Sequence, residues 1–559
     1  MTFTLTGTKP GVRDIDRGGV GSTPPLLVLA AAFVVRVIPA AAYFFNPDEA
    51  LHYLAASQSS LRLTYQAALT NAHPPLLILV LHFWQWLGQS ELILRMPSVL
   101  AGTACCWLFF LWLAEVTNRT TAFMGLLLMA FAPSLIALSS EVRQYALLLF
   151  FIAACLLLSE RALRSNSPWL MALFSLALFG ALLTHYSSLL FALAIGIYVL
   201  VRLIRHRAGG DVVLVWILGQ IIAVAIVVYF LLTHVRRLKA MGMPQEIAET
   251  WLRRSIFHSA EHNIISFISV QTLRVFTYLF SHGLVGTLMM LAFLAGMFAL
   301  LTGRAKEFSP APTREELALL LSLPFLLNCA AGIVGIYPFG GTRHNALLAP
   351  FAMSGAAISI SFVLLERTWA RSYWIKVSPV VAALVLCNFF PSPAPLIKAR
   401  NHSKELMRDA VDHLRVVTPP GSVIFSDYES GLLLGFYACD RGVVQIFPPL
   451  KRFAKADCGV HTAITARPDE WRFKADNLQS ELNDAAASYN LAPGTKVWLF
   501  DAGWINDLAP AISRGKNCSQ PRFFGENILI CELTVGHRLP ATQRAATISP
   551  AFSGAESAR

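Results

Sequence analysis

The chain has 559 residues, of which 55% are hydrophobic and only 14% are charged, and its formal net charge is +12. Soluble domains carry about 25% charged residues, so this composition excludes an ordinary soluble protein. Much of the positive charge lies in short loops between apolar runs. It therefore indicates membrane topology and not nucleic-acid binding.

Long apolar runs predict about eleven membrane-spanning helices, because about 20 apolar residues cross roughly 30 Å of hydrocarbon. The predicted spans are 25–45, 98–116, 121–139, 146–160, 168–186, 188–204, 211–232, 284–302, 317–336, 346–365 and 374–391. The shorter run 75–88 follows Pro74-Pro75 and predicts an interfacial or re-entrant helix. The predicted fold class is thus mainly α: a polytopic helical membrane protein with a C-terminal soluble α/β domain.

Lysine and arginine gather in alternate loops, and such loops face the cytoplasm. The basic groups are Lys9, Arg13 and Arg17; Arg161 and Arg164; Arg202, Arg205 and Arg207; Arg304, Lys306 and Arg314; and Arg367, Arg371 and Lys376. We predict a bacterial inner (plasma) membrane protein whose N-terminal tail, 1–24, is cytoplasmic. Everything after about 392 is then periplasmic or extracellular. Inside the first span, Arg36 has two interpretations: it snorkels toward a headgroup, or it is functional.

The composition shifts near 392, where Pro391, Pro393 and Pro395 indicate a linker after a transmembrane domain of 25–391. Residues 392–536 then predict an extracytoplasmic α/β domain, and 537–559 a disordered tail. Within the domain we expect helices at 402–417 and 470–489 and strands at 422–426 and 496–500.

Four of the nine cysteines lie in this external domain, at positions 439, 458, 518 and 531. Four cysteines allow three pairings, and an oxidising compartment makes disulfides reasonable. We adopt the nearest-neighbour pairing, Cys439 with Cys458 and Cys518 with Cys531. No CxxC spacing supports zinc, and the cysteines in the spans indicate packing.

The first external loop begins with Asn46-Pro47-Asp48-Glu49, where the first apolar run ends. The simple interpretation is a helix start, since Asn caps helices and Pro and acids favour the first turn. Several further clusters fall on the same face under the predicted topology: His73, Arg95, Glu141, Arg143, Tyr145, His185, Arg343 and His344. Each alone also fits a cap, an ion pair, a turn or an interface anchor. Their co-location favours group transfer from an anionic lipid.

Five motifs resemble a known family: Asn46-Pro-Asp-Glu-Ala, His73-Pro-Pro-Leu, Arg95-Met-Pro-Ser, Glu141-Val-Arg-Gln-Tyr and Gly341-Thr-Arg-His. They resemble the bacterial relatives of protein O-mannosyltransferases and lipid A aminoarabinose transferases, which are C-type glycosyltransferases that use polyprenyl-phosphate sugars. The resemblance covers roughly residues 25–391. His73 stands where aminoarabinose transferases tend to have lysine, and the Trp-Trp-Asp motif of oligosaccharyltransferases is absent from the sequence.

The resemblance implies transfer of a hexosyl or pentosyl group from a lipid phosphate to an acceptor hydroxyl. A hydroxyl is a poor nucleophile, so a carboxylate should take its proton. We assign this general base to Asp48, with Glu49 as the second choice or as an orienting group. The leaving phosphate suits Arg143 and Arg343, assisted by His73, and Glu141 either positions Arg143 or binds sugar hydroxyls. Arg95, Tyr145 and His344 complete the predicted substrate-binding residues, and a single displacement would invert the anomeric centre.

No cofactor is required by these residues, although two carboxylates and His73 could hold a divalent ion. The expected partners are the polyprenyl-phosphate sugar, membrane lipid and an acceptor glycan, lipid or protein, without nucleic acid. The alternative function is a transporter or flippase for a lipid-linked or anionic solute. Transporters place ionisable groups near the midplane and often contain repeats. These spans hold few charges and show no repeat between halves.

Overall fold

The structure is a computed structural model that describes residues 23–240, 249, 252–261, 263–303, 311–365, 373–391, 403–439, 452–466, 472–504, 508, 512 and 518–536. The chain divides into two compact units. The first comprises Met1–Ala41, Asn71–Leu77 and Leu92–Leu396, and the second Ala42–Thr70, Ile78–Glu91 and Ile397–Arg559. The second unit therefore combines the C-terminal domain with most of the first predicted loop. The predicted basic N-terminal tail, the linker near 392 and the tail 537–559 lie outside the described residues.

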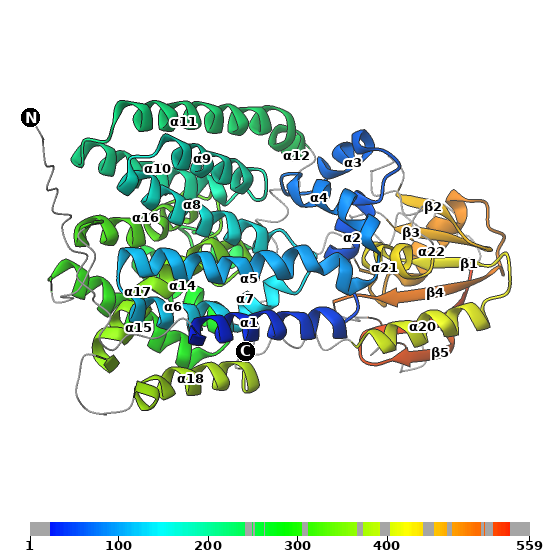
Figure 1. The fold of residues 1–559 in the computed structure, drawn as a ribbon. Helices are drawn as coiled ribbons and strands as arrows, with labels where there is room; N and C mark the ends of the chain where they lie inside the picture. The colour runs from blue at the N-terminus through cyan, green and yellow to red at the C-terminus, as the bar shows by residue number, and fades with distance from the viewer. Residues whose placement is uncertain are drawn as a thin grey trace, which may run out of the picture. The chain divides into compact units, whose positions relative to one another are not determined.

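The first unit is a helical bundle (Figure 1). Its helices are α1 (Thr23–Ala42), α5 (Glu91–Val116), α6 (Arg119–Phe131), α7 (Pro133–Ser139), α8 (Tyr145–Ser165), α9 (Pro168–Leu182), α10 (Ser188–Arg205), α11 (Gly210–Phe230), α12 (Arg236–Ala240), α14 (Ile264–Phe280), α15 (Gly283–Leu301), α16 (Arg314–Ile333), α17 (Ala349–Ile360) and α18 (Tyr373–Phe389). Within the described residues, eight helical stretches are long and apolar enough to span a membrane, or nine if α6 and α7 form one bent span. The protein is a multi-pass membrane protein, as predicted.

The number of spans is the main difference from the sequence-based expectation of about eleven. The run 168–186 forms a helix of only 15 residues, because Thr184-His185-Tyr186 belongs to the following loop. The segment between the predicted spans 211–232 and 284–302, where no helix was predicted, contains the 17-residue helix α14. The Asn263 side chain caps α14 by accepting hydrogen bonds from the amides of Ile265 and Ser266.

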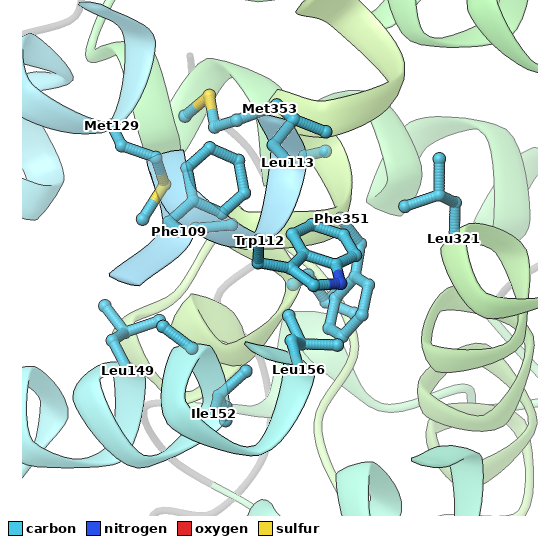
Figure 2. Packing of buried hydrophobic residues seen from close by; sticks show 14 of the residues in the cluster. Phe109, Trp112, Leu113, Met129, Leu149, Ile152, Leu156, Leu321, Phe351 and Met353 are labelled. Carbon is cyan, nitrogen blue, oxygen red and sulfur yellow. The ribbon is translucent and has the colours of Figure 1, made fainter. Parts of the chain in front are cut away.

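The core of the bundle is built from side chains of α5, α8 and α17 (Figure 2). Phe109, Trp112 and Leu113 of α5 pack there with residues of α8 such as Ile152 and residues of α17 such as Phe351, and all five are fully buried. Small residues let α15 and α17 approach closely. A Cβ added at Gly296 would lie 2.0 Å from the carbonyl oxygen of Gly355, so this pair requires glycine, as is common between membrane helices.

Arg36 is buried inside the bundle, with 1% of its surface exposed. Its guanidinium donates hydrogen bonds to the carbonyls of Met129 (3.2 Å) and Ala130 (2.9 Å) at the end of α6. Pro133 has no N–H to bond the Met129 carbonyl, and α6 and α7 meet at a bend of 60°. Arg36 therefore donates hydrogen bonds to carbonyls at the break between α6 and α7. The interpretation that Arg36 snorkels toward a headgroup is wrong.

Charged side chains also meet where the C-terminal ends of α8 and α10 lie beside the N-terminal end of α16. Arg202 contacts Glu160 at 2.8 Å and Glu316 at 3.4 Å, and all three are buried. Glu316 also forms a capping box with Thr313 at the start of α16. The predicted basic loops of these helices thus lie at one end of the bundle, while Tyr145 and His185 lie at the other ends of α8 and α10. Glu160, Arg202 and Glu316 therefore lie toward the ends of their helices.

The second unit contains α2 (Pro47–Ala56), α3 (Leu61–Ala68), most of α4 (Leu76–Trp84) and a C-terminal α/β layer. The six-stranded sheet has the order β2-β3-β1-β4-β6-β5, in which only β1 pairs in parallel, with β3 and β4. Its strands are β1 (Val423–Ser426), β2 (Phe453–Cys458), β3 (His461–Ala466), β4 (Lys496–Ala502), β5 (Ser519–Phe524) and β6 (Ile528–Thr534), and its helices are α20 (Lys404–Val417), α21 (Tyr428–Tyr437) and α22 (Leu478–Ser488).

Both helices and both strands expected in the C-terminal domain are present, although α22 begins later than predicted. The sequence-based analysis missed α21, which follows β1 directly. Disulfides join Cys439 to Cys458 and Cys518 to Cys531, in the adopted pairing. The apolar stretch Leu76–Leu87 rises only about 18 Å at 1.5 Å per residue, too short for a full crossing.

Candidate active site

Each unit contains one group of the predicted site residues. In the first unit, four rings form a cluster that we call the ring cluster: His73, Tyr145, His185 and His344. The ring of His185 stacks on that of His73 with centroids 4.9 Å apart, and it lies 5.2 Å from Tyr145 and 5.9 Å from His344. The four residues come from four separate loops or helix starts, so the fold brings together residues that the topology placed on one face.

His185 is the buried centre of this cluster, with 1% of its surface exposed. Its Nδ1 accepts a hydrogen bond of 3.1 Å from the Ser187 amide, which places the ring proton on Nε2. Nε2 has no partner among the described residues, and neither has the hydroxyl of Tyr145. Burial, with Arg143 and Arg343 as a smaller cause, lowers the pKa of His185 from 6.5 to about 3. The ring is therefore a neutral hydrogen-bond donor at physiological pH.

Arginine supplies positive charge to the ring cluster. The guanidinium of Arg143 lies 5.7 Å from the centroid of the Tyr145 ring. The turn that carries Arg143 is fixed to α5, since the Ser98 hydroxyl donates to the Arg143 carbonyl at 3.2 Å. Arg143 and Arg343 both act electrostatically on His185, so both guanidinium groups belong to the surroundings of the cluster. Arg143 is buried and Arg343 is half-buried, and such cations beside neutral donors suit a phosphate group.

Two glycines explain how Arg343 and His344 reach this place. Gly340 has a φ of +145°, and a Cβ there would meet the Gln271 side chain at 2.2 Å. A Cβ at Gly341 would lie 2.5 Å from the carbonyl oxygen of Arg274. Gly340-Gly341 therefore does more than form a turn: it lets the chain pass directly over α14 before the 3₁₀ turn that begins at Arg343.

The second unit contains the predicted base. The Asn46 side chain accepts a hydrogen bond of 3.0 Å from the Glu49 amide, and the Glu49 carboxylate accepts one of 3.0 Å from the Asn46 amide. This is a complete capping box. Glu49 is buried with 1% of its surface exposed, whereas Asp48 is half-buried in the same first turn of α2. The predicted cap thus exists, and Glu49 is the acid that completes it.

Helix α21 packs against α2 inside this unit. The ring of Phe436 stacks on Phe45 with centroids 4.5 Å apart and meets Tyr53 edge-on at 4.9 Å. At its other end α21 brings Tyr428 and Glu429 near enough to Asp48 for its charge to raise the pKa of both side chains. The C-terminal domain therefore contributes directly to the surroundings of the predicted base, which the sequence-based analysis did not anticipate.

A buried polar group supports the first turn of α21. Asp427 caps the helix by accepting a 2.9 Å hydrogen bond from the Ser430 amide, and Glu429 accepts one of 3.3 Å from the Trp504 amide. Burial raises the pKa of Asp427 to about 6. Burial, reinforced by Asp427, raises the pKa of Glu429 to about 8. Glu429 is therefore largely protonated at neutral pH.

The remaining predicted residues lie in the first unit. Arg95 is buried in α5 and donates a 2.9 Å hydrogen bond to the Ala40 carbonyl of α1, so at least part of its role is to join two helices. Glu141 is buried in the turn before Arg143, whose amide bonds the Glu141 carbonyl at 2.8 Å. Among the described residues, no group of three or more His, Cys, Asp or Glu side chains could hold a metal ion.

Two residues, His185 in the ring cluster and Tyr337 beside it, were given no role from the sequence. His185 was predicted to share a face with the other site residues, and the structure places it among them. Tyr337 packs against His344 with ring centroids 6.4 Å apart, and its hydroxyl donates to the His344 carbonyl at 3.3 Å. The sequence offered one signal for both residues, because each lies at the predicted external end of a predicted span.

Comparison with known proteins agrees with the fold. A model of the dolichyl-phosphate-mannose-protein mannosyltransferase family matches residues 72–232. The crystal structure of ArnT from Cupriavidus metallidurans bound to undecaprenyl phosphate is similar, with a TM-score of 0.51 and 14% identity over 93% of this chain and 100% of that chain. The apo structure of ArnT has a TM-score of 0.51 at 12% identity, over 92% of this chain and 99% of that chain. No curated protein sequence matches the chain.

A weaker likeness, with a TM-score of 0.47 and 12% identity, is to the Archaeoglobus fulgidus oligosaccharyltransferase tethered with an acceptor peptide; it covers 86% of this chain and 69% of that chain. At these identities the structures establish the fold, while the family model matches the sequence itself. The matched segment includes His73, Arg143, Tyr145 and His185. Residues 72–232 are thus similar in sequence to the protein mannosyltransferase family, and the chain shares the fold of the membrane protein ArnT.

Proposed function

We propose that the protein transfers a sugar from a polyprenyl-phosphate donor to an acceptor hydroxyl at the extracytoplasmic face of a bacterial inner membrane. The observation that carries the proposal is the ring cluster, where buried donors with no partner among the described residues meet the charges of Arg143 and Arg343. A lipid phosphate has the charge and the acceptor oxygens that such a set requires. The similar structure of ArnT is bound to undecaprenyl phosphate. A polyprenyl phosphate is what remains of such a donor after its sugar has been transferred.

The reaction is a single displacement. The acceptor oxygen attacks the anomeric carbon, and the bond from that carbon to the phosphate oxygen breaks with its electron pair going to the phosphate. The acceptor proton passes to Asp48, which yields the glycosylated acceptor and free polyprenyl phosphate. Attack from the face opposite the leaving group inverts the anomeric centre. Arginine and neutral His185 stabilise the charge that develops on the phosphate.

Asp48 is preferred to Glu49 as the base for a structural reason. The Glu49 carboxylate already accepts the Asn46 amide and is buried, so protonating it would weaken the cap. Asp48 is half-buried on the same turn, and the cap fixes the direction in which its side chain leaves the helix. A rigidly held carboxylate with access to the acceptor is what general-base catalysis needs.

The extracytoplasmic location is supported by charge. The basic loops that contain Arg161, Arg164, Arg202 and Arg205 lie at the ends of α8 and α10 opposite to the ring cluster. If those loops are cytoplasmic, as the positive-inside rule predicts, the ring cluster faces the other side.

The direct test uses membrane vesicles with radiolabelled polyprenyl-phosphate sugars. We expect Asp48→Asn to reduce transfer by at least about a hundredfold, and Arg143→Gln to raise the donor concentration needed for half-maximal transfer. Glu115→Gln, a change at a partly exposed ion pair with Arg161, serves as the matched control. Equal transfer by wild type and Asp48→Asn at equal expression would refute the assigned base. A chelator added to the same assay tests the expectation that no metal is needed.

A further inference from the structure

The second unit contains a cavity of about 260 Å³ that no role described above uses. Lys404, Arg408 and Arg415 line it from α20, Phe436 and Tyr437 from α21, and Glu91 completes the wall. We propose that this cavity binds an anionic group, a phosphate or a carboxylate, carried by the acceptor. The proposal rests on the proposed function, because it identifies the chemistry of the acceptor in that reaction.

The cations of α20 share one face of the helix. Positions 404 and 408 are four residues apart and positions 408 and 415 are seven apart, which is about one and two turns of the helix, so the three side chains lie in a row. The neighbouring face, with Met407, Ala410 and Leu414, is buried in the unit. Burial of that face fixes the orientation of α20, so the three cations are held on the side of the helix that lines the cavity.

The two carboxylates that line the cavity, Glu91 and Asp412, each have a partner. Glu91 accepts a 3.1 Å hydrogen bond from the Tyr437 hydroxyl. Asp412 lies 3.5 Å from Arg415, and both side chains are more than half exposed, so this pair is weak. Among the residues that the structure describes, Lys404 and Arg408 form no ion pair, and they supply the positive charge that an anion would meet. A cationic ligand would instead face three positive side chains.

The cavity also has apolar walls, which a small inorganic ion does not need. Val411 is 4% exposed and lines it together with the ring of Phe436. Charged donors beside an aromatic ring are typical of a site that binds a sugar or lipid bearing an anionic substituent. The volume of the cavity also exceeds what one water or ion would fill.

Its position connects the cavity with the reaction. Tyr437 lines the cavity, and its hydroxyl accepts a 2.8 Å hydrogen bond from the Phe45 amide. Phe45 directly precedes the Asn46 cap, and Asp48 lies three residues further along the chain. Tyr437 thus contacts both the cavity and the residue before the turn that carries the proposed base.

Residue-resolved protection tests binding without knowledge of the natural acceptor. Full-length protein in phosphatidylcholine nanodiscs is treated with an amine-acylating reagent, with and without inorganic pyrophosphate, against sodium chloride at equal ionic strength. We expect pyrophosphate to slow modification of Lys404 several-fold and saturably, and to leave Lys455 and Lys474, two exposed lysines of the same unit, unchanged. Equal rates for all three lysines would overturn the proposal. The footprint is read on wild-type protein, so a folding defect in a variant cannot imitate it.

A second arm separates the acceptor from the membrane as the source of the anion. Nanodiscs containing phosphatidylglycerol replace those of phosphatidylcholine, without pyrophosphate. Protection of Lys404 by phosphatidylglycerol alone, with no effect of pyrophosphate, would overturn the assignment to an acceptor and identify a lipid-headgroup site. Protection by pyrophosphate in both lipids supports the proposal.

Kinetics then connect the site with transfer. The Lys404→Gln/Arg408→Gln variant should raise the acceptor concentration needed for half-maximal transfer about tenfold, with kcat and the donor KM unchanged. The Lys455→Gln/Lys474→Gln variant should match wild type. If the cavity variant also matches wild type while Asp48→Asn is inactive, the cavity proposal fails and the proposed function stands. If Asp48→Asn is as active as wild type, the assigned base fails whatever the footprint shows.

Discussion

The main-chain amide of Phe45 donates a 2.8 Å hydrogen bond to the Tyr437 hydroxyl, which in turn donates to Glu91 at 3.1 Å. The Tyr437 hydroxyl of the C-terminal domain thus connects Phe45, which precedes the Asn46 cap, with Glu91 at the start of α5. The stacking of Phe436 on Phe45 reinforces the same contact. The C-terminal domain is therefore a support for the helix that carries Asp48.

Removing the Tyr437 hydroxyl should lower kcat and leave the donor KM unchanged. In Tyr437→Phe the Phe45 amide loses its acceptor, which costs about 1–3 kcal/mol of stability. We expect kcat to fall about tenfold, since small displacements of a catalytic group are costly, while the donor KM stays constant. Tyr489→Phe is the control, because it deletes a hydroxyl that donates at 2.7 Å to the Phe453 carbonyl in the same unit. Equal kcat losses in both variants would indicate a general loss of stability.

Substitutions at Glu49 should separate a capping role from a catalytic one. Glu49→Gln keeps an oxygen that can accept the Asn46 amide, so it should retain most of the transfer activity. Glu49→Ala removes half of the capping box and should cost about 1 kcal/mol of stability. Thermal unfolding and transfer rates measured on both variants check this. If Glu49→Gln were as inactive as Asp48→Asn, Glu49 would be the base.

The sequence predicted the ring cluster better than it predicted the surroundings of Asp48. Long apolar runs and basic loops determine which residues share a face, so the grouping of His73, Tyr145 and His344 was predictable. The neutral state of His185 was not, because it depends on burial and on two arginines distant in sequence. The packing of α21 on α2 was also not predictable, since hydrophobic periodicity shows that an element has a buried face but not which element covers it.

His185 should bind the donor with the same strength across physiological pH. Its pKa of about 3 means that the ring is neutral both at pH 5 and at pH 8, so no charge is gained or lost in between. The ratio of the donor KM of His185→Gln to that of wild type should therefore be greater than one and independent of pH over this range. A ratio that rises as the pH falls through 6.5 would show that His185 becomes protonated and binds the phosphate as a cation.

Glu429 should make stability depend on pH. Its pKa is raised to about 8 by burial, Asp427 and Asp48, while Arg472 opposes the shift. The folded protein therefore keeps this proton at pH values where the unfolded chain has lost it, so stability falls as pH rises from about 4.5 to 8. Glu429→Gln should flatten this part of the curve and raise the Tm at pH 8. Thermal unfolding of the full-length protein from pH 5 to 9 tests it, and an unchanged slope would contradict the assignment.

Arg36 should be essential for folding without taking part in transfer. In Arg36→Met the carbonyls of Met129 and Ala130 lose a buried donor, and each unsatisfied carbonyl costs about 1–3 kcal/mol. We expect a large loss of folded protein or of Tm, with a normal donor KM in the fraction that folds. Arg161→Gln is the control, because its ion pair with Glu115 is partly exposed and should be worth about 1 kcal/mol or less. A stable Arg36→Met protein with no activity would instead assign Arg36 to the chemistry. The break between α6 and α7 leads to this prediction, because Pro133 leaves the Met129 carbonyl without a helical donor and the two terminal nitrogens of Arg36 bond that carbonyl and the carbonyl of Ala130.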